Sequence, residues 1–160
     1  MPQIDLTWID EQRFLGVDSS GHSMVLSPPN DVGVKPSDTL LISLAACAAH
    51  DVVEIVRKQR LPLQRLAVRV SATQASEAPW AYQQIHLHFE VQAPGARPRQ
   101  LERAIDLALN SYCSVRASLS PAIAVTSFAF ALAAGLVVIF AGYPDRMATF
   151  FSVSFVWCPQ

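Results

Sequence analysis

The sequence predicts an α+β domain in which helices pack on antiparallel sheets. Three observations lead to this class. Segments in which apolar and polar residues alternate occur at the start and in the middle of the chain, as in half-buried strands. Two longer segments have apolar residues at helical spacing. The resulting order of three strands, helix, two strands, helix and strand lacks the strict strand–helix alternation of a parallel sheet.

The first predicted element is a three-stranded meander over residues 3–26. Its strands are QIDLTW, RFLGVD and SMVL, and turn-forming residues separate them. A loop with three prolines, SPPNDVGVKPSD, follows. The loop ends where Pro36 and Ser37 can begin a helix.

The central helix is predicted over residues 37–60. Asp38 lies in its first turn and the basic residues of VRKQR lie in its last, so both ends match the helix dipole. The first half of the helix, LLISLAACAA, is apolar on all sides, and we therefore expect protein to surround it. Pro62 ends the helix.

The second half of the domain contains two adjacent antiparallel strands, predicted in LQRLAVRVSATQ and YQQIHLHFEVQA. The segment RPRQLERAIDLALNSYC is predicted to be the second helix, and a short further helix begins near Cys113. A last strand is predicted over residues 122–130.

Composition excludes several classes of function. The net charge of -1, without a basic stripe, makes nucleic acid a poor partner. Three cysteines are too few for a disulfide-stapled secreted scaffold. The N-terminal MPQIDLTWIDEQRF lacks the basic and apolar regions of a signal peptide. We therefore expect a reducing, cytoplasmic compartment, in which a thiol is catalytic, metal-binding or inert.

Cys47, deep in the central helix, and Cys113, at the end of the second helix, are the candidate redox residues. A thiol at a helix N-terminus is shifted toward its thiolate form. Two thiols that are distant in sequence but close in space can run a peroxidatic cycle. One thiolate attacks the O–O bond and becomes a sulfenic acid, the other condenses with it to a disulfide, and an external thiol resets the pair.

Simpler interpretations stay open for each of these residues. A free cysteine is usually a small buried hydrophobe. Cys47 shares a helix face with His50 and Asp51, and a second thiol could join them, but without a CxxC pair the pattern does not predict a zinc site. His86 and His88 share one strand face, which an exposed polar surface explains.

Several segments resemble the OsmC/Ohr family. The run KPSDTLLISLAACAAHDVVEIVRKQR is similar to the central helix of that family, and LALNSYCSVRASL is similar to its second cysteine motif. The opening W…RFLGVDSSGHSMVL resembles its N-terminal meander, and EAPWAYQQIHLHFEV resembles its middle strands. The resemblance covers residues 1–130, and two cysteine motifs in the right order make it specific.

The resemblance implies an OsmC-like fold and an intertwined homodimer, with two long helices at its centre and active sites at the subunit interface. It also implies thiol-dependent reduction of organic hydroperoxides, a part of the oxidative stress response, with Cys47 attacking and Cys113 resolving. No cofactor beyond an external thiol or dithiol reductant is implied. The alternative is a non-enzymatic member of the same fold that senses redox state or binds an apolar ligand.

The resemblance also draws attention to Arg13 and Asp38. Well-characterised branches pair the attacking cysteine with an arginine from the meander, which favours the thiolate, and with a glutamate near the helix start, which holds the arginine. Arg13 is the only arginine in the meander, whereas Ser37 stands at the position of the glutamate and Asp38 follows it. Arg13 and Asp38 are thus the candidates for thiolate activation. An ordinary strand-surface arginine and an ordinary first-turn acid are the simpler interpretations.

Residues 131–160 are predicted to be an atypical hydrophobic tail after the OsmC-like domain of residues 1–130. The run from Ala122 to Tyr143 carries no charge and has about the ~20 residues that span a bilayer. The tail is interpreted as the product of an altered reading frame, as a packed extension or as a membrane anchor. The abrupt change of composition favours the first, and only the third implies membrane contact. Cys158 is given no role.

Overall fold

The computed structural model describes residues 3–133 and 136–142, with side chains described as far as Phe130. The chain divides into two compact units, residues 1–43 and 44–160, and each is described separately below.

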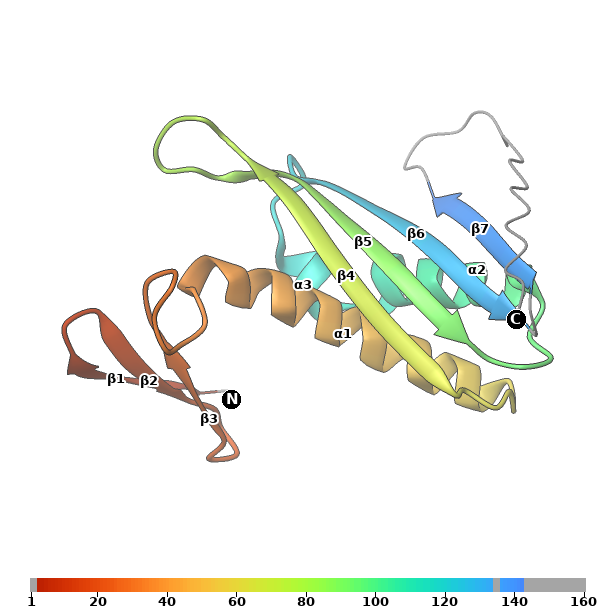
Figure 1. Cartoon of the computed structure of the whole chain (residues 1–160), viewed down its shortest axis with the longest axis horizontal. Coiled ribbons are helices and arrows are strands. Elements are labelled where there is room, and N and C mark those ends of the chain that lie inside the picture. The colour runs from red at the N-terminus through yellow and green to blue at the C-terminus, as the bar shows by residue number, and fades with distance from the viewer. Residues whose placement is uncertain (1–2, 134–135, 143–160) are drawn as a thin grey trace, which may run out of the picture. The chain divides into compact units, whose positions relative to one another are not determined.

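The first unit contains the predicted antiparallel meander, in the order β1-β2-β3 (Figure 1). Its strands are β1 (Asp5–Asp10), β2 (Arg13–Val17) and β3 (Ser23–Leu26). The proline-rich loop folds back along β3, because the N–H of Val34 donates to the carbonyl of Val25 at 2.9 Å. A Cβ on Gly33 would lie 2.6 Å from the carbonyl oxygen of Val25, so this close approach requires glycine.

Helix α1 (Pro36–Lys58) begins in the first unit and continues into the second. Its fully buried residues recur every four positions and form one stripe, namely Leu44, Ala48, Val52 and Val56. The expectation that protein covers the first half on all sides is not met within one chain, since Ile42 is 50% exposed. Among the described residues, α1 alone is long and apolar enough to cross a membrane, a test that the core helix of a soluble protein also passes.

The second unit is built on a four-stranded sheet in the order β4-β5-β6-β7. Its strands are β4 (Arg65–Gln74), β5 (Tyr82–Gln92), β6 (Ala124–Ala133) and β7 (Leu136–Gly142). The sheet is mixed, because β5 and β6 are parallel while the other pairs are antiparallel. The predicted α+β class with antiparallel sheets is confirmed, and one pair of strands in this sheet departs from it by being parallel. A crossover through a helix returns the chain to the starting end of β5, which makes the next strand parallel.

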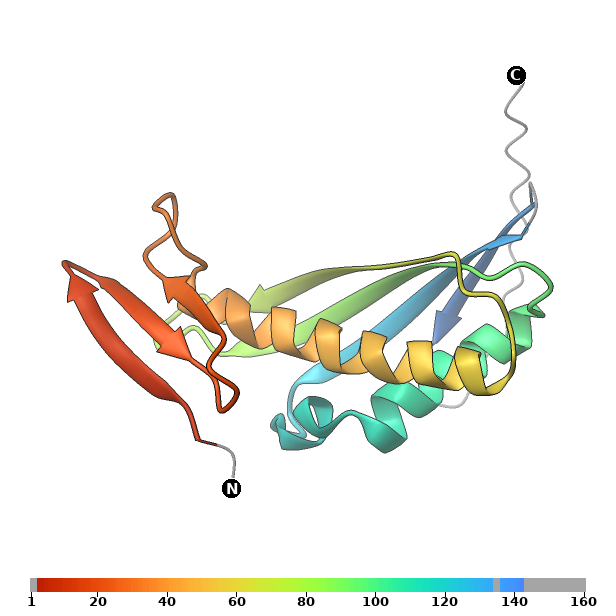
Figure 2. The same ribbon diagram turned by 90° about the horizontal axis from the view of Figure 1, so that it is seen from below.

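Three helical segments form that crossover, and Figure 2 shows α2 and α3 on the same face of the sheet as α1. They are α2 (Pro98–Leu107), the π-helix η1 (Ala108–Tyr112) and α3 (Ser114–Ser118). The core lies between these helices and the inner face of β5, where Ile85, Leu87 and Phe89 are fully buried. The single helix predicted for this region thus ends in a π-helical turn, and the carbonyl of Ala108 accepts from the N–H of Cys113 at 2.8 Å.

The last described strands lie in the charge-free run. Strand β6 continues to Ala133 rather than ending at Phe130, and β7 pairs with it antiparallel. Across the described residues this run forms two strands and not one helix. Residues 143–160, including Cys158, lie outside the described residues, and the three interpretations of the tail stay predictions.

Candidate thiol site

The helix α1 places Cys47 at the edge of its buried stripe. Leu44 and Ala48 on either side of it are fully buried, whereas Cys47 is partly exposed. Both Leu44 and Cys47 belong to the second unit, together with the helices of the crossover. The thiol is thus held by a rigid core helix and remains accessible to a small molecule.

The end of the π-helix η1 places Cys113. The helical backbone is interrupted at this residue, which has φ -67° and ψ 103° and forms the N-cap of α3. Its Sγ accepts a hydrogen bond from the N–H of Arg116 at 3.3 Å. The side chain is 3% exposed, so the thiol is fixed and buried.

The contact between α1 and the junction of η1 with α3 brings the two cysteines together. The Cys113 thiol lies close enough to the Cys47 sulfur for each to shift the pKa of the other. The Ser114 Oγ lies 3.9 Å from the Cys47 Sγ. The backbone of Ser114 and Val115 near Cys47 also favours its thiolate form. No group of three potential metal-ligating side chains occurs among the residues that the structure describes.

These contacts give the two thiols opposite acidities. Burial tends to raise the pKa of Cys47, but hydrogen bonds from Val115, Cys113 and Ser114 outweigh it and hold the pKa below its ordinary value. Burial, together with the donated hydrogen bond and the negative charge on Cys47, raises the pKa of Cys113 to about 11. Near neutral pH, Cys47 is therefore the better thiolate and Cys113 is the protonated donor.

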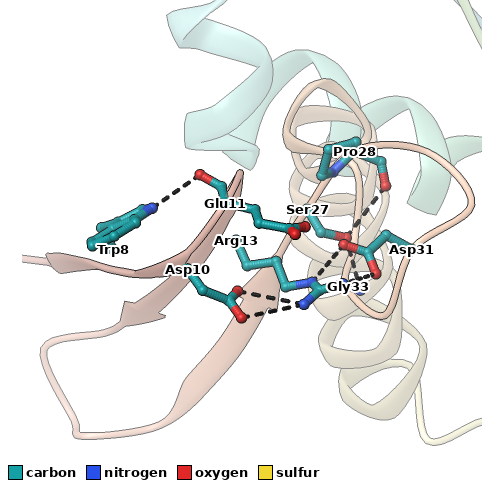
Figure 3. A network of polar contacts seen from close by, with 8 residues as sticks. All are labelled: Trp8, Asp10, Glu11, Arg13, Ser27, Pro28, Asp31 and Gly33. Carbon is teal, nitrogen blue, oxygen red and sulfur yellow. Dashed lines mark hydrogen bonds and ion pairs between the residues drawn. The ribbon is translucent and has the colours of Figure 1, made fainter.

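Arg13 and Asp38 lie in the first unit and have partners there. The guanidinium of Arg13 donates two hydrogen bonds to Asp31, at 2.7 and 2.9 Å, and is 3.4 Å from Asp10 (Figure 3). Asp38 is 3.7 Å from the Nζ of Lys35. The hydrogen bond from Arg13 lowers the pKa of Asp31. The role of Arg13 and Asp38 in thiolate activation stays a prediction.

The histidines that the sequence singled out differ in their surroundings: His86 is exposed as predicted, whereas His88 is half-buried and its Nε2 is buried. The Nδ1 of His86 is 2.7 Å from the Thr126 Oγ1. The ring of His88 packs edge-on against that of Phe128, with 5.3 Å between centroids. His50 is exposed and lies 3.9 Å from a carboxylate oxygen of Asp51.

Sequence reasoning missed Ser114 and the π-helix before it. A serine directly after a cysteine that caps a short helix was visible in the motif YCSV. Its contact with Cys47 was not, because that contact depends on how α1 packs against the junction of η1 with α3. A π-helical turn has no sequence pattern that separates it from the end of an α-helix, although such turns are frequent at functional sites.

Comparison with known proteins gives a family model and curated relatives. A family model described as OsmC-like protein matches residues 28–128. Protein YhfA of Escherichia coli K12 is 31% identical over 125 residues, which cover 78% of this chain and 93% of that protein. The matched range of the family model includes both Cys47 and Cys113.

Solved structures share the fold. The OsmC-like protein from Mycoplasma pneumoniae superposes with a TM-score of 0.69 at 16% identity, over 81% of this chain and 96% of that chain. An organic hydroperoxide resistance protein, OsmC, from Legionella pneumophila superposes with a TM-score of 0.58 at 10% identity, over 79% of this chain and 94% of that chain. At these identities the likeness extends to the fold alone.

Proposed function

The chain belongs to the OsmC-like protein family, and we propose from this premise that it is a thiol-dependent peroxidase that reduces organic hydroperoxides. The observation that carries the proposal is the proximity of Cys47 to Cys113 at the junction of η1 with α3, where Cys47 contacts the adjacent Ser114 and has the lowered pKa while Cys113 has the raised one. A protein that shares the fold, from Legionella pneumophila, is an organic hydroperoxide resistance protein, which supports the choice of substrate class.

The proposed cycle has three balanced steps. The Cys47 thiolate attacks the outer oxygen of the hydroperoxide, so that an S–O bond forms, the O–O bond breaks and the leaving alkoxide takes a proton to become an alcohol. The Cys113 thiol then attacks the sulfur of the sulfenic acid, which forms the disulfide and releases water. An external dithiol reduces the disulfide and restores both thiols.

The assembly and the compartment are parts of the same proposal. We propose a cytoplasmic homodimer without a cofactor, in which a second copy covers apolar side chains that one chain leaves exposed. These include Leu6 at 55%, Trp8 at 63% and Ile42 at 50% exposure. The reducing cytoplasm would supply the dithiol on which each turnover depends.

The test is consumption of cumene hydroperoxide by the full-length protein with dihydrolipoamide as reductant. We expect the wild type to turn over many equivalents and Cys47→Ser to consume none above the uncatalysed rate. Cys113→Ser should turn over more slowly than the wild type, because the external dithiol must then attack the Cys47 sulfenic acid directly. Cys158→Ser is the control and should match the wild type.

A wild type no faster than Cys47→Ser would sink the peroxidase proposal. If the wild-type thiols were in addition oxidised once and reversibly, the non-enzymatic alternative, a redox sensor of the same fold, would be favoured. The two functions are thus separated by one assay.

A further inference from the structure

The groups that hold the Cys47 sulfur are uncharged. The hydroxyl of Ser114 lies 3.9 Å from it, and the thiol of Cys113 and the backbone of Ser114 and Val115 lower its pKa. Two of these, the hydroxyl and the thiol, are side chains that a substitution can remove. Cys113 already has a role in the proposed cycle as the resolving thiol, whereas Ser114 has none.

We propose that Ser114 is a catalytic residue whose hydroxyl donates a hydrogen bond to the Cys47 thiolate and orients its Sγ for attack. The inference rests on the proposed function, because an oriented thiolate matters only if it attacks a substrate. A hydroxyl oxygen facing a thiolate has one arrangement available, with the O–H donating, since the thiolate has no proton to give.

The backbone of Ser114 is held from both sides, and its exposed side chain contacts Cys47. Ser114 is the first residue of α3, where its carbonyl accepts from the Ser118 hydroxyl at 2.8 Å. The preceding Cys113 caps the same helix through the N–H of Arg116 at 3.3 Å. Ser114 is therefore a donor held in place before the substrate arrives, whereas a water in its position would have to be ordered.

A hydrogen bond donated to the thiolate accelerates the reaction only at a pH below the pKa of the thiol, where most of the thiol is still protonated. Lowering a thiol pKa by one unit raises the thiolate fraction about tenfold where the pH lies below the pKa, and lowers the intrinsic nucleophilicity by about threefold. The net gain at a pH below the pKa is about threefold. Above the pKa the thiolate is fully formed, and the same hydrogen bond slows the attack.

The ionisable groups around this contact lie on the elements that meet there. Cys113 and Arg116 come from the junction of η1 with α3, and His50 and Asp51 lie one turn beyond Cys47 on α1. His50 pairs with Asp51 at 3.9 Å. All four are retained in the variants below, so any change in the pH profile of Cys47 belongs to the hydroxyl.

The experiment measures alkylation of Cys47 by iodoacetamide as a function of pH, resolved by peptide mass spectrometry in the reduced full-length protein. In Ser114→Ala we expect the midpoint to rise by about one pH unit, since a hydrogen bond to a charged group has about that strength. Alkylation near neutral pH should fall about threefold, and it should be as fast as the wild type or faster in strong base. Ser114→Thr keeps the hydroxyl and should restore most of the rate.

The matched control is Ser111→Ala, which removes an exposed hydroxyl from η1 and should leave the profile unchanged. Should Ser114→Ala fail to fold, Ser114→Gly tests the same loss. A profile of either variant that superimposes on that of the wild type overturns the inference. Because alkylation needs no peroxide, a shifted profile in a protein without turnover would refute the proposed function and leave the hydrogen bond established.

Discussion

The Cys47 and Cys113 sulfurs influence each other, yet their surroundings shift their pKa values in opposite directions. Cys47 is partly exposed and receives donors from Ser114 and Val115, which stabilise its negative charge. Cys113 is buried beside that charge, which opposes its own ionisation. Both residues are cysteines, so the difference between their pKa values follows from their surroundings. Single substitutions near either sulfur should therefore change that difference.

The pair Cys113→Ala and Cys113→Ser separates the two tasks of Cys113. The alanine removes a donor to Cys47, so the pKa of Cys47 should rise and the first oxidation by cumene hydroperoxide should slow about threefold near neutral pH. The serine keeps a donor, so that step should stay near the wild-type rate. Stopped-flow kinetics over a range of pH checks this, and equal rates for the two variants would count against a donating thiol.

The ion pair between Arg13 and Asp31 should make the first unit more stable above the pKa of a free aspartate. The pKa of Asp31 is lowered by folding, so the stabilisation is present above the unfolded pKa and is lost as the pH falls through the folded one. Asp31→Asn should therefore lower the urea midpoint at neutral pH, and the difference from the wild type should shrink in acid. A difference that does not depend on pH would contradict this reading.

The resemblance implies that Arg13 and Asp38 activate the thiolate. The same alkylation assay compares their effect on the rate of Cys47 alkylation with that of Ser114. Because Arg13 is already bound to two aspartates, we expect Arg13→Gln to slow the alkylation of Cys47 by less than Ser114→Ala does. Asp38→Asn should behave likewise. A larger effect of Arg13→Gln than of Ser114→Ala would show that the arginine contributes more than the serine to activating Cys47, as the resemblance implies.

At the scale of elements, alternation and helical spacing predicted most of the described strands and helices. Two features were out of reach. Alternation fixes the face of a strand but not the direction of its neighbour, so the parallel pairing of β6 with β5 came only from the structure. Helical spacing in LALNSYC does not distinguish the π-helix η1, which decides where Cys113 lies.

The fully buried Ala108 connects the π-helix η1 to the thiol site, because the carbonyl of Ala108 accepts a hydrogen bond from the N–H of Cys113. Ala108→Leu should cost about 1–3 kcal/mol of unfolding free energy through overpacking, and should displace Cys113. We therefore expect a lower denaturation midpoint together with slower disulfide formation after oxidation. Ala122→Leu, at an exposed position, is the control and should change neither. Loss of stability with an unchanged rate of disulfide formation would show that η1 does not position Cys113 for that reaction.

At the scale of the whole molecule, the sequence located the candidate thiols but not the contacts between them. Both cysteines stand in recognisable motifs, so their identity could be predicted. Their meeting depends on the packing of α1 against the crossover, to which every core residue contributes, and Ser114 enters the site only through that packing. The exposed apolar residues of β1 would be covered in the proposed homodimer.

The proposed homodimer predicts that a charge on the apolar face of β1 separates the subunits. Leu6 is 55% exposed, and burying a second copy against it would remove apolar surface from water. Leu6→Glu should therefore shift the mass measured by light scattering from two chains toward one. Thr7→Glu, on the opposite face of the same strand, is the control. A wild type with the mass of one chain would refute the dimer.

The most direct test of the central claim is to map the thiols of the intact reduced protein after one equivalent of cumene hydroperoxide. The account predicts that Cys47 and Cys113 of one chain become joined in a disulfide, that Cys158 stays free, and that a dithiol restores both thiols. Survival of the Cys47 and Cys113 thiols in excess peroxide would contradict it, and the two cysteines would then be core residues of an OsmC-like protein with another task.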